Sequence, residues 1–151
     1  RMNNRSRSET AFQALSEIAI IGRLADTALA QTLPNELSVA GFGVLNHFVR
    51  LGRQQESPAQ LARAFQVTKG AMTYTLQRLE ALGYVRIAPD PSDARAKIVR
   101  PTKAGLRARA EAVSRVAPGM AALVAYMGEA EFAAALPFLI KLRQALDAAG
   151  V

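Results

Sequence analysis

Apolar residues recur at helical spacing along most of the chain, beginning with its first long segment. From residue 8 to 33 a wide apolar stripe repeats every three or four positions, which predicts a helix that packs against more than one neighbour. Pro34 ends this helix, and Ser38 is placed to cap a second one that stops near Gly52. The predicted inward residues of the second helix are Phe42, Leu45, Phe48 and Val49.

A compact pair of helices comes next. Residues 57–60 (SPAQ) combine a capping serine, a proline at the first helical position and a glutamine that can return a hydrogen bond to the cap. Thr68 can cap the following helix, which runs to about Leu82 and meets Gly83, a residue suited to a left-handed helix end. The buried face of that helix is predicted to hold Met72, Leu76 and Leu79. Two helices joined by so short a turn predict a helix-turn-helix.

Two short segments after Gly83 have the pattern of strands. Residues 84–88 (YVRIA) alternate between apolar and polar, and residues 97–100 (KIVR) have the β-branched content of a partner strand. Between them, residues 89–96 (PDPSDARA) hold turn formers at nearly every position. The pattern predicts a hairpin whose loop is longer than two residues and projects from the body.

Two further helices are predicted toward the C-terminus. Thr102 can cap a long helix, with a kink expected at Pro118 and Gly119. Gly128 separates it from a last apolar helix, in which Pro137 is expected to cause a bend or a break. The chain is therefore predicted to be mainly α with a small β-hairpin, an α+β winged helix-turn-helix fold.

Positive charge is concentrated in the central part of the chain. Residues 53–109 hold 11 Lys or Arg against 4 Asp or Glu, so they account for the whole formal net charge of +7. Such a cluster favours nucleic-acid binding, because neutralising phosphates releases condensed counterions. We therefore assign residues 34–101 to a DNA-binding head, and residues 8–33 and 102–149 to a helical dimerisation region, within one domain of residues 1–151.

The absence of cysteine narrows the chemistry that the chain can perform. Without a thiol it can form no disulfide, zinc–thiolate cluster or iron–sulfur site, and it cannot sense oxidants through a thiol. The lone His47 is more typical of a packed core residue than of a metal ligand, and Asp90 and Asp93 lack an accompanying nucleophile or phosphate loop. We expect no cofactor, no metal and no enzyme activity. No apolar run has the length of a signal peptide or a membrane span, which predicts a cytoplasmic protein with no membrane partner.

The order of these elements resembles the MarR family of bacterial transcriptional regulators across almost the whole chain. The wing motif DPSDAR, followed by Val99, Thr102 and Gly105, carries the sharpest match, and residues 78–85 (RLEALGYV) match the end of the family's recognition helix. The sequence departs from the pattern at Ala94, where a second Arg is frequent, and at Pro101, where Leu is usual.

The resemblance implies a function and roles for two wing residues. Asp93 is implied to brace the wing loop, and Arg95 to enter the minor groove. It also implies a repressor that a small aromatic or phenolic ligand releases from DNA, through a site between the dimer base and the head.

The solvent-facing side of the second helix of the pair is predicted to read bases. A recognition helix in the major groove presents the residues of its N-terminal half to base edges. Lys69 suits guanine or a phosphate, Gln77 suits an adenine edge, and the Thr73 methyl suits thymine. The predicted contact set on this helix is Thr68, Lys69, Gly70, Thr73, Tyr74 and Gln77. A plain solvated helix face is the alternative, above all for Tyr74.

The wing residues extend this predicted surface. Arg95 on a projecting loop can insert into a narrow minor groove, where the potential is most negative. Asp93 would be repelled by DNA, so we expect it to turn inward to Arg95 or to loop amides, unless it is an ordinary turn residue. Lys97, with Arg100 and Lys103, is a candidate phosphate contact or simple surface charge.

The apolar terminal helices predict association. They carry more apolar surface than a small head can cover, which favours a two-fold homodimer that reads pseudo-palindromic operator half-sites in double-stranded DNA, roughly 34 to 36 Å apart. The residues that could line an effector cavity, or equally fill the core, are Phe12, Phe42, Phe48 and Met120.

Two functions from different classes follow from the sequence. The favoured one is a sequence-specific transcriptional regulator. The rival is a winged helix that binds proteins, or binds DNA without sequence preference as an architectural module. Binding to a panel of duplexes separates them, because only a regulator ranks one sequence far above the rest.

Overall fold

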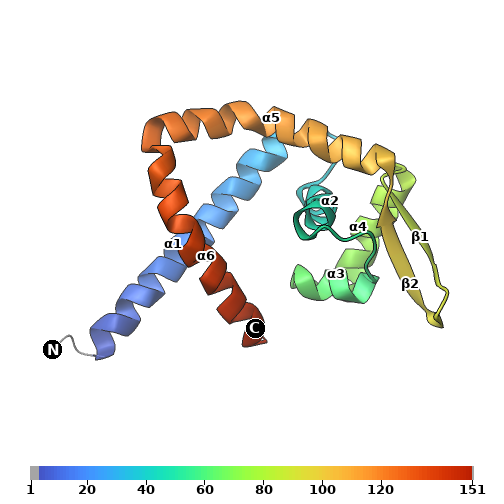
Figure 1. Ribbon diagram of the computed structural model, residues 1–151, viewed down its shortest axis with the longest axis horizontal. Coiled ribbons are helices and arrows are strands. Elements are labelled where there is room, and N and C mark those ends of the chain that lie inside the picture. The colour runs from blue at the N-terminus through green and yellow to red at the C-terminus, as the bar shows by residue number, and fades with distance from the viewer. Residues whose placement is uncertain (1–3, 151) are drawn as a thin grey trace. The chain divides into compact units, whose positions relative to one another are not determined.

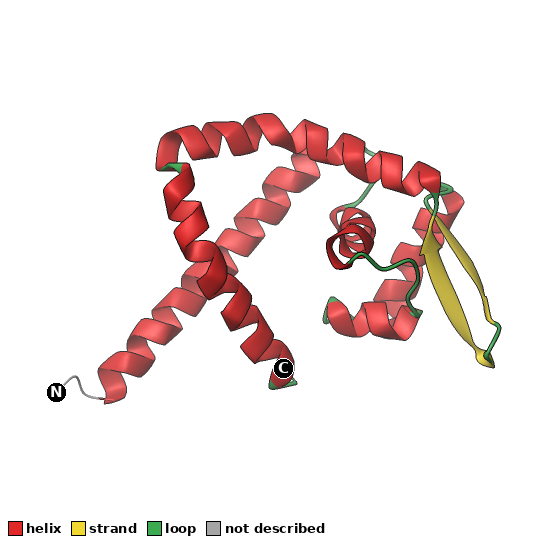
Figure 2. Ribbon diagram, in the orientation of Figure 1, coloured by secondary structure: helices red, strands yellow, loops and turns green. Residues whose placement is uncertain are grey.

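The computed structural model describes residues 4–150, and Figure 1 shows their course from helix to hairpin to helix. The elements are α1 (Asn4–Thr32), α2 (Val39–Leu51), α3 (Pro58–Ala64), α4 (Lys69–Ala81), β1 (Val85–Asp90), β2 (Asp93–Pro101), α5 (Lys103–Met127) and α6 (Glu129–Ala148). The chain divides into two compact units between Arg115 and Val116, inside α5. Helices and one antiparallel hairpin make up the described fold, which confirms the predicted α+β class (Figure 2).

The helix starts follow the capping signals of the sequence. The Ser38 side chain accepts a hydrogen bond from the Gly41 N–H at 3.0 Å, and Thr68 accepts one from the Ala71 N–H at 3.1 Å. Before α3 the Ser57 hydroxyl accepts from the Gln60 N–H at 3.1 Å, and the Gln60 side chain accepts from the Ser57 N–H at 2.9 Å. Two of the backbone N–H groups that the first turn leaves without a helical partner, those of Ser57 and Gln60, are thus satisfied, as in a capping box.

The core lies among α2, α3, α4 and the hairpin. Leu45, Leu61 and Val99 are fully buried, and so is the predicted stripe of α4, Met72, Leu76 and Leu79. The inward face of α2 differs from the prediction at two positions: Val44, which was not predicted inward, is buried, and Val49, which was, is 41% exposed. The buried side of α2 is centred near Val44 and Phe48, and Val49, one residue after Phe48, lies about 100° round the helix at the edge of that side, where an apolar residue can stay exposed.

The wing is longer and its turn is tighter than predicted. β1 and β2 continue through most of the expected loop, and only Pro91 and Ser92 connect them. Asp90 pairs with Asp93, and the register shifts between Pro89 and Asp90. Residues 94–96 of β2 lie between the partners of Asp90 and Pro89, so a bulge absorbs them, and turn-forming residues are compatible with paired strands there. The expected long projecting loop was wrong, although the hairpin itself projects.

A third short segment pairs with the wing. Glu56, in the connector after α2, forms an isolated antiparallel bridge with Val99 of β2. The Glu56 N–H donates to the Val99 carbonyl at 3.1 Å, and the Val99 N–H donates to the Glu56 carbonyl at 2.8 Å. The connector between α2 and α3 therefore attaches the base of the wing to the helix-turn-helix.

The start of α5 is joined tightly to the end of α4. The Thr102 hydroxyl donates to the Gly83 carbonyl at 2.6 Å and accepts from the Gly105 N–H at 3.0 Å. A Cβ on Gly105 would collide with the backbone carbonyl of Tyr84. Gly105 is therefore required for close approach of two backbones, and this explains a glycine at the start of a helix.

Both long C-terminal helices contain a proline without a break. α5 continues through Pro118 and α6 through Pro137, so the break considered for α6 is absent. A kink at Pro118 stays a prediction. Among the described helices, none alone has the length and apolar content to cross a membrane. Taken together, α5 and α6 have that length and apolar content, but they form a pair bent by 103°.

Candidate nucleic-acid interface

The predicted base-reading residues lie together on the exposed side of α4. Lys69, Gly70 and Gln77 are exposed, as are Thr73 and Tyr74. The opposite side of the helix carries the buried stripe of Met72, Leu76 and Leu79, which fixes the orientation of α4 against the head. The core therefore decides which side chains of α4 face outward.

Neighbouring groups already occupy some of these side chains. The Thr73 hydroxyl donates to the Lys69 carbonyl at 2.9 Å, a bond that leaves its methyl group outward. The Tyr74 hydroxyl accepts from Arg78 at 3.1 Å, and the same guanidinium lies 5.8 Å from the centre of the tyrosine ring. In the described part of the chain Lys69 and Gln77 have no hydrogen bond or ion pair through their side chains, so their polar ends are free.

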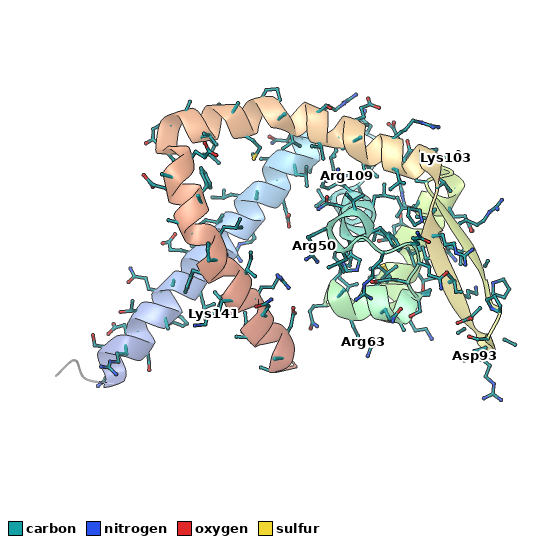
Figure 3. All side chains as sticks on the ribbon, viewed as in Figure 1. Arg50, Arg63, Asp93, Lys103, Arg109 and Lys141 are labelled. Atoms are coloured by element: carbon teal, nitrogen blue, oxygen red, sulfur yellow. The ribbon has the colours of Figure 1, made fainter. Side chains whose placement is uncertain are left out.

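The tip of the wing presents Arg95 while its acids bind backbone. The Asp93 carboxylate accepts from the N–H of Arg95 at 3.0 Å, and Figure 3 shows Asp93 at the tip of the hairpin. The Arg95 side chain is exposed and, among residues 4–150, has no partner. Asp93 thus holds the loop amide of Arg95, a bond that fits both the inward arrangement expected for it and an ordinary turn aspartate, and it leaves the guanidinium unengaged.

Asp90 closes the two-residue turn. Its carboxylate accepts from the Ser92 N–H at 2.9 Å and from the Ser92 hydroxyl at 2.8 Å. These bonds lower the pKa of Asp90 below its ordinary value, the backbone bond contributing most, because they stabilise the charged form. The turn thus keeps its shape at neutral pH without a partner of opposite charge.

A groove lies between α4 and the wing. It encloses about 330 Å³, and Thr73 and Gln77 of α4 line it together with Lys97 of β2. The structure therefore brings two predicted base-reading residues and a predicted phosphate contact to one surface. Arg95, at the tip, does not line this groove.

An ionic side chain fixes the hairpin to α4. The Glu80 carboxylate, near the end of α4, accepts a hydrogen bond from the N–H of Ile87 in β1 at 2.9 Å. This N–H points away from β2 at the open edge of the hairpin, where it would otherwise face solvent. The sequence gives no local sign of this contact, because Glu80 has the position of an ordinary surface acid on an exposed helix face.

The acidic residues of the central segment leave the cations free. Glu80, Asp90 and Asp93 all accept from backbone N–H groups, and none forms an ion pair in the described structure. Only Glu56 pairs with a cation, because its carboxylate lies 2.9 Å from Arg53. The other basic side chains of residues 53–109 are thus not neutralised by acids of their own segment, which preserves a positive surface.

Two of these arginines serve structural contacts instead. Arg100 donates to the Gln55 side chain at 3.1 and 2.6 Å, and so connects β2 to the connector before α3. Arg109 of α5 donates to the Asn46 side chain of α2 at 3.2 and 3.1 Å, and Figure 3 shows Arg109 directed toward α2. Lys103 remains exposed at the start of α5.

The lone histidine belongs to a buried polar cluster. His47 Nε2 lies 3.0 Å from the Glu56 carboxylate, whose other oxygen binds Arg53, and the Phe65 ring lies 5.3 Å from the imidazole. Both His47 and Glu56 are buried. A buried carboxylate with two partners is compensated, so the cluster holds the connector against α2. No group of residues placed to bind a metal occurs in the described part of the chain.

The four residues proposed to line an effector cavity lie in different surroundings. Phe48 is part of the core, at 1% exposure, which agrees with the alternative that these side chains fill the interior. Phe42 is half-buried and lines a cavity beside α1. Phe12 on α1 is 73% exposed and Met120 on α5 is 51% exposed.

Known proteins match this arrangement. The sequence model described as the MarR family matches residues 36–96, the segment from before α2 to the wing. The transcriptional regulator BldR from Sulfolobus solfataricus is 25% identical with a TM-score of 0.76, over 97% of this chain and 99% of that one. No curated protein matches the sequence.

Two further solved structures bear on the interface. A mutant MarR from E. coli, in complex with operator DNA, is 26% identical with a TM-score of 0.68, over 83% of this chain and 89% of that one. Bordetella bronchiseptica BpsR, whose DNA binding is regulated by 6-hydroxynicotinic acid, has a TM-score of 0.68 over 86% of this chain and 98% of that one. Its 22% identity shows a common fold only.

Proposed function

This chain belongs to the MarR family, and from that premise we propose that it is a sequence-specific regulator of transcription that binds double-stranded DNA. The observation that carries the proposal is the groove that Thr73 and Gln77 of α4 line together with Lys97 of the wing. Lys69 and Gln77 have free polar ends on the exposed face of α4, while Asp93 holds the loop that presents Arg95. A helix that reads the major groove and an arginine that enters the minor groove need these two placements at once.

The surface charge supports the same conclusion. The acids of the central segment bind backbone N–H groups or a buried cluster, so its cations other than Arg53, Arg100 and Arg109 are available to phosphates. The E. coli MarR that crystallised with operator DNA has the same fold at 26% identity. Phosphate contacts from such a surface position the protein, whereas contacts from α4 specify the sequence.

The proposed regulator acts as a homodimer and as a repressor. α6 has no buried residue in its own chain, although it carries Phe132, Leu136 and Phe138 on its surface. Apolar surface of that extent favours a second copy as its cover, and two heads would then match a pseudo-palindromic operator. We further propose a small aromatic effector, for which BpsR offers a precedent within the same fold.

Selection and titration of duplex DNA test the proposed function. Duplexes selected by the protein from a random library are titrated at several salt concentrations against a scrambled duplex of equal composition. We expect the selected sequence to bind about 10³-fold or more tightly than the scrambled one, with affinity falling steeply as salt rises. Equal affinity for both duplexes would contradict sequence-specific regulation and support the architectural alternative.

A further inference from the structure

A cavity of about 580 Å³ lies on the side of α4 that faces away from the proposed DNA surface. Its walls come from α1, from the start of α2, from the turn before α4 and from α4 itself. Phe42 of α2 and Phe65, just after α3, are its aromatic side chains, and Met72 of α4 contributes a thioether. The volume and apolar lining are those of a site for a small organic molecule.

One charged side chain lines this cavity, and it is acidic. Asp26 of α1 lies one turn before Leu29, so both present the same face of the helix to the cavity. Within the described residues the side chain of Asp26 forms no ion pair or hydrogen bond. The remaining polar lining group is the Thr75 hydroxyl, which can accept or donate. No Lys or Arg lines the cavity.

The charge of the lining selects among aromatic ligands. A carboxylate at the rim and aromatic faces in the wall both attract a cation, and a guest carboxylate would be repelled by the same Asp26. The net charge of the chain, +7, favours anions at long range. Exposed charges beyond about 8 Å are screened at physiological ionic strength, so Asp26 and the lining rings decide the selectivity.

We propose that this cavity binds an aromatic cation, an organic amine whose ring lies against Phe42 and Phe65 and whose ammonium group pairs with Asp26. The ligand would contact the inner side of α4 at Met72 and Thr75, while Thr73 and Gln77 lie on the outer side of the same helix. A ligand that prefers one position of α4 over another shifts the population of heads able to bind DNA. This regulatory consequence rests on the proposed function, whereas the binding itself does not.

Calorimetry without DNA tests the binding. Three probes share one ring system and differ in charge: 1-naphthylmethylammonium, 1-naphthalenemethanol and 1-naphthoate. We expect the cation to bind about tenfold or more tightly than the anion, with the alcohol between them. Asp26→Asn should abolish most of this preference, because it removes the charge and keeps the shape. Glu17→Gln removes an exposed acid from α1 outside the cavity lining and should leave the preference unchanged.

A second variant tests the location. Ala40 of α2 lines the cavity and is exposed, so Ala40→Leu fills space without burying a polar group, and it should weaken all three probes together. Equal binding of cation and anion, or an unchanged preference in Asp26→Asn, would overturn the proposal. So would the absence of binding by any probe, since a second copy of the chain would then be the better candidate to cover the cavity.

The effect on DNA is measured separately, by anisotropy of the selected duplex with and without 1-naphthylmethylammonium. A change in duplex affinity that Asp26→Asn removes supports the regulatory role. A ligand that binds in calorimetry but leaves duplex affinity unchanged contradicts that role alone. Equal affinity for the selected and the scrambled duplex, with ligand binding intact, contradicts the proposed function alone.

Discussion

At the residue scale, the wing tip separates a structural carboxylate from a free guanidinium. Asp93 accepts the N–H of Arg95 at 3.0 Å, and Asp90 closes the turn through Ser92. Neither acid binds the Arg95 side chain, which is exposed. The loop therefore keeps its shape independently of the arginine head group, so removing the head group tests DNA contact without disturbing the turn.

We expect Arg95→Ala to weaken binding of the selected duplex by about 10-fold or more and to flatten any preference for A·T pairs at its flanks. The reason is that a guanidinium in a narrow minor groove gains from the negative potential there. Duplex titration by fluorescence anisotropy measures both effects. Arg7→Ala removes the same charge from exposed α1 and serves as the control for long-range attraction. Unchanged affinity and salt dependence in Arg95→Ala would remove the wing tip from the interface.

At the element scale, α4, the hairpin and the start of α5 act as one unit because three contacts join them. Glu80 binds the Ile87 N–H, Thr102 binds the Gly83 carbonyl, and Gly105 allows α5 to approach Tyr84. The bridge between Glu56 and Val99 fixes the other edge of the wing. The relative orientation of the helix and the wing, which the DNA would meet, is therefore set by polar contacts at their ends as well as by the core.

We expect Glu80→Ala to loosen the hairpin from α4, because the Ile87 N–H loses its acceptor within the protein. The loss in the free energy of unfolding should be about 0.5–1.5 kcal/mol, since water can replace the bond at this exposed site. Hydrogen exchange should become faster at the Ile87 amide, and duplex affinity should fall while Lys69 and Arg95 remain in place. Glu80→Gln keeps an acceptor oxygen and should behave more like the original protein. Unchanged exchange at Ile87 in Glu80→Ala would show that the contact does not hold the wing.

At the scale of the whole molecule, the apolar surface of the terminal helices is left without a cover. Large apolar side chains are exposed on α1, on the second half of α5 and on α6, and α6 buries none of its residues within the chain. The described head, by contrast, has a closed core with no buried side-chain polar atom left unbonded. Such a division is typical of a protein whose terminal helices are completed by another copy.

We expect the protein to sediment as a dimer at micromolar concentration, and Leu136→Glu on α6 to shift it toward monomer. Leu136 is 56% exposed in the single chain, and burying a new carboxylate in an apolar contact would be costly. Gln54→Glu adds the same charge on the exposed connector and should leave the dimer intact. Sedimentation velocity distinguishes the outcomes, and a stable monomer of the unmodified chain would contradict the proposed homodimer.

Local signals in the sequence predicted most of the fold. Ser38, Ser57 and Thr68 mark helix starts because a side-chain cap depends only on residues within one turn. The stripe of α4 predicted its buried side, and with it the exposed set from Lys69 to Gln77. The wing was the exception, since turn-forming residues and paired strands can share a sequence when a bulge absorbs the mismatch.

By itself, then, the sequence determined the order of helices and hairpin, the faces of the helix-turn-helix and the concentration of positive charge, because each depends on neighbouring residues or on simple counts. The tertiary structure decided which polar groups meet: Glu80 with Ile87, and Glu56 with His47 and Val99. It also placed Asp26 at an otherwise apolar cavity. These partners come from different elements, and no local pattern encodes their distance. The packing of the core brings them together. In the folded protein Glu80 therefore positions the wing, and Asp26 supplies the charge of the proposed ligand site.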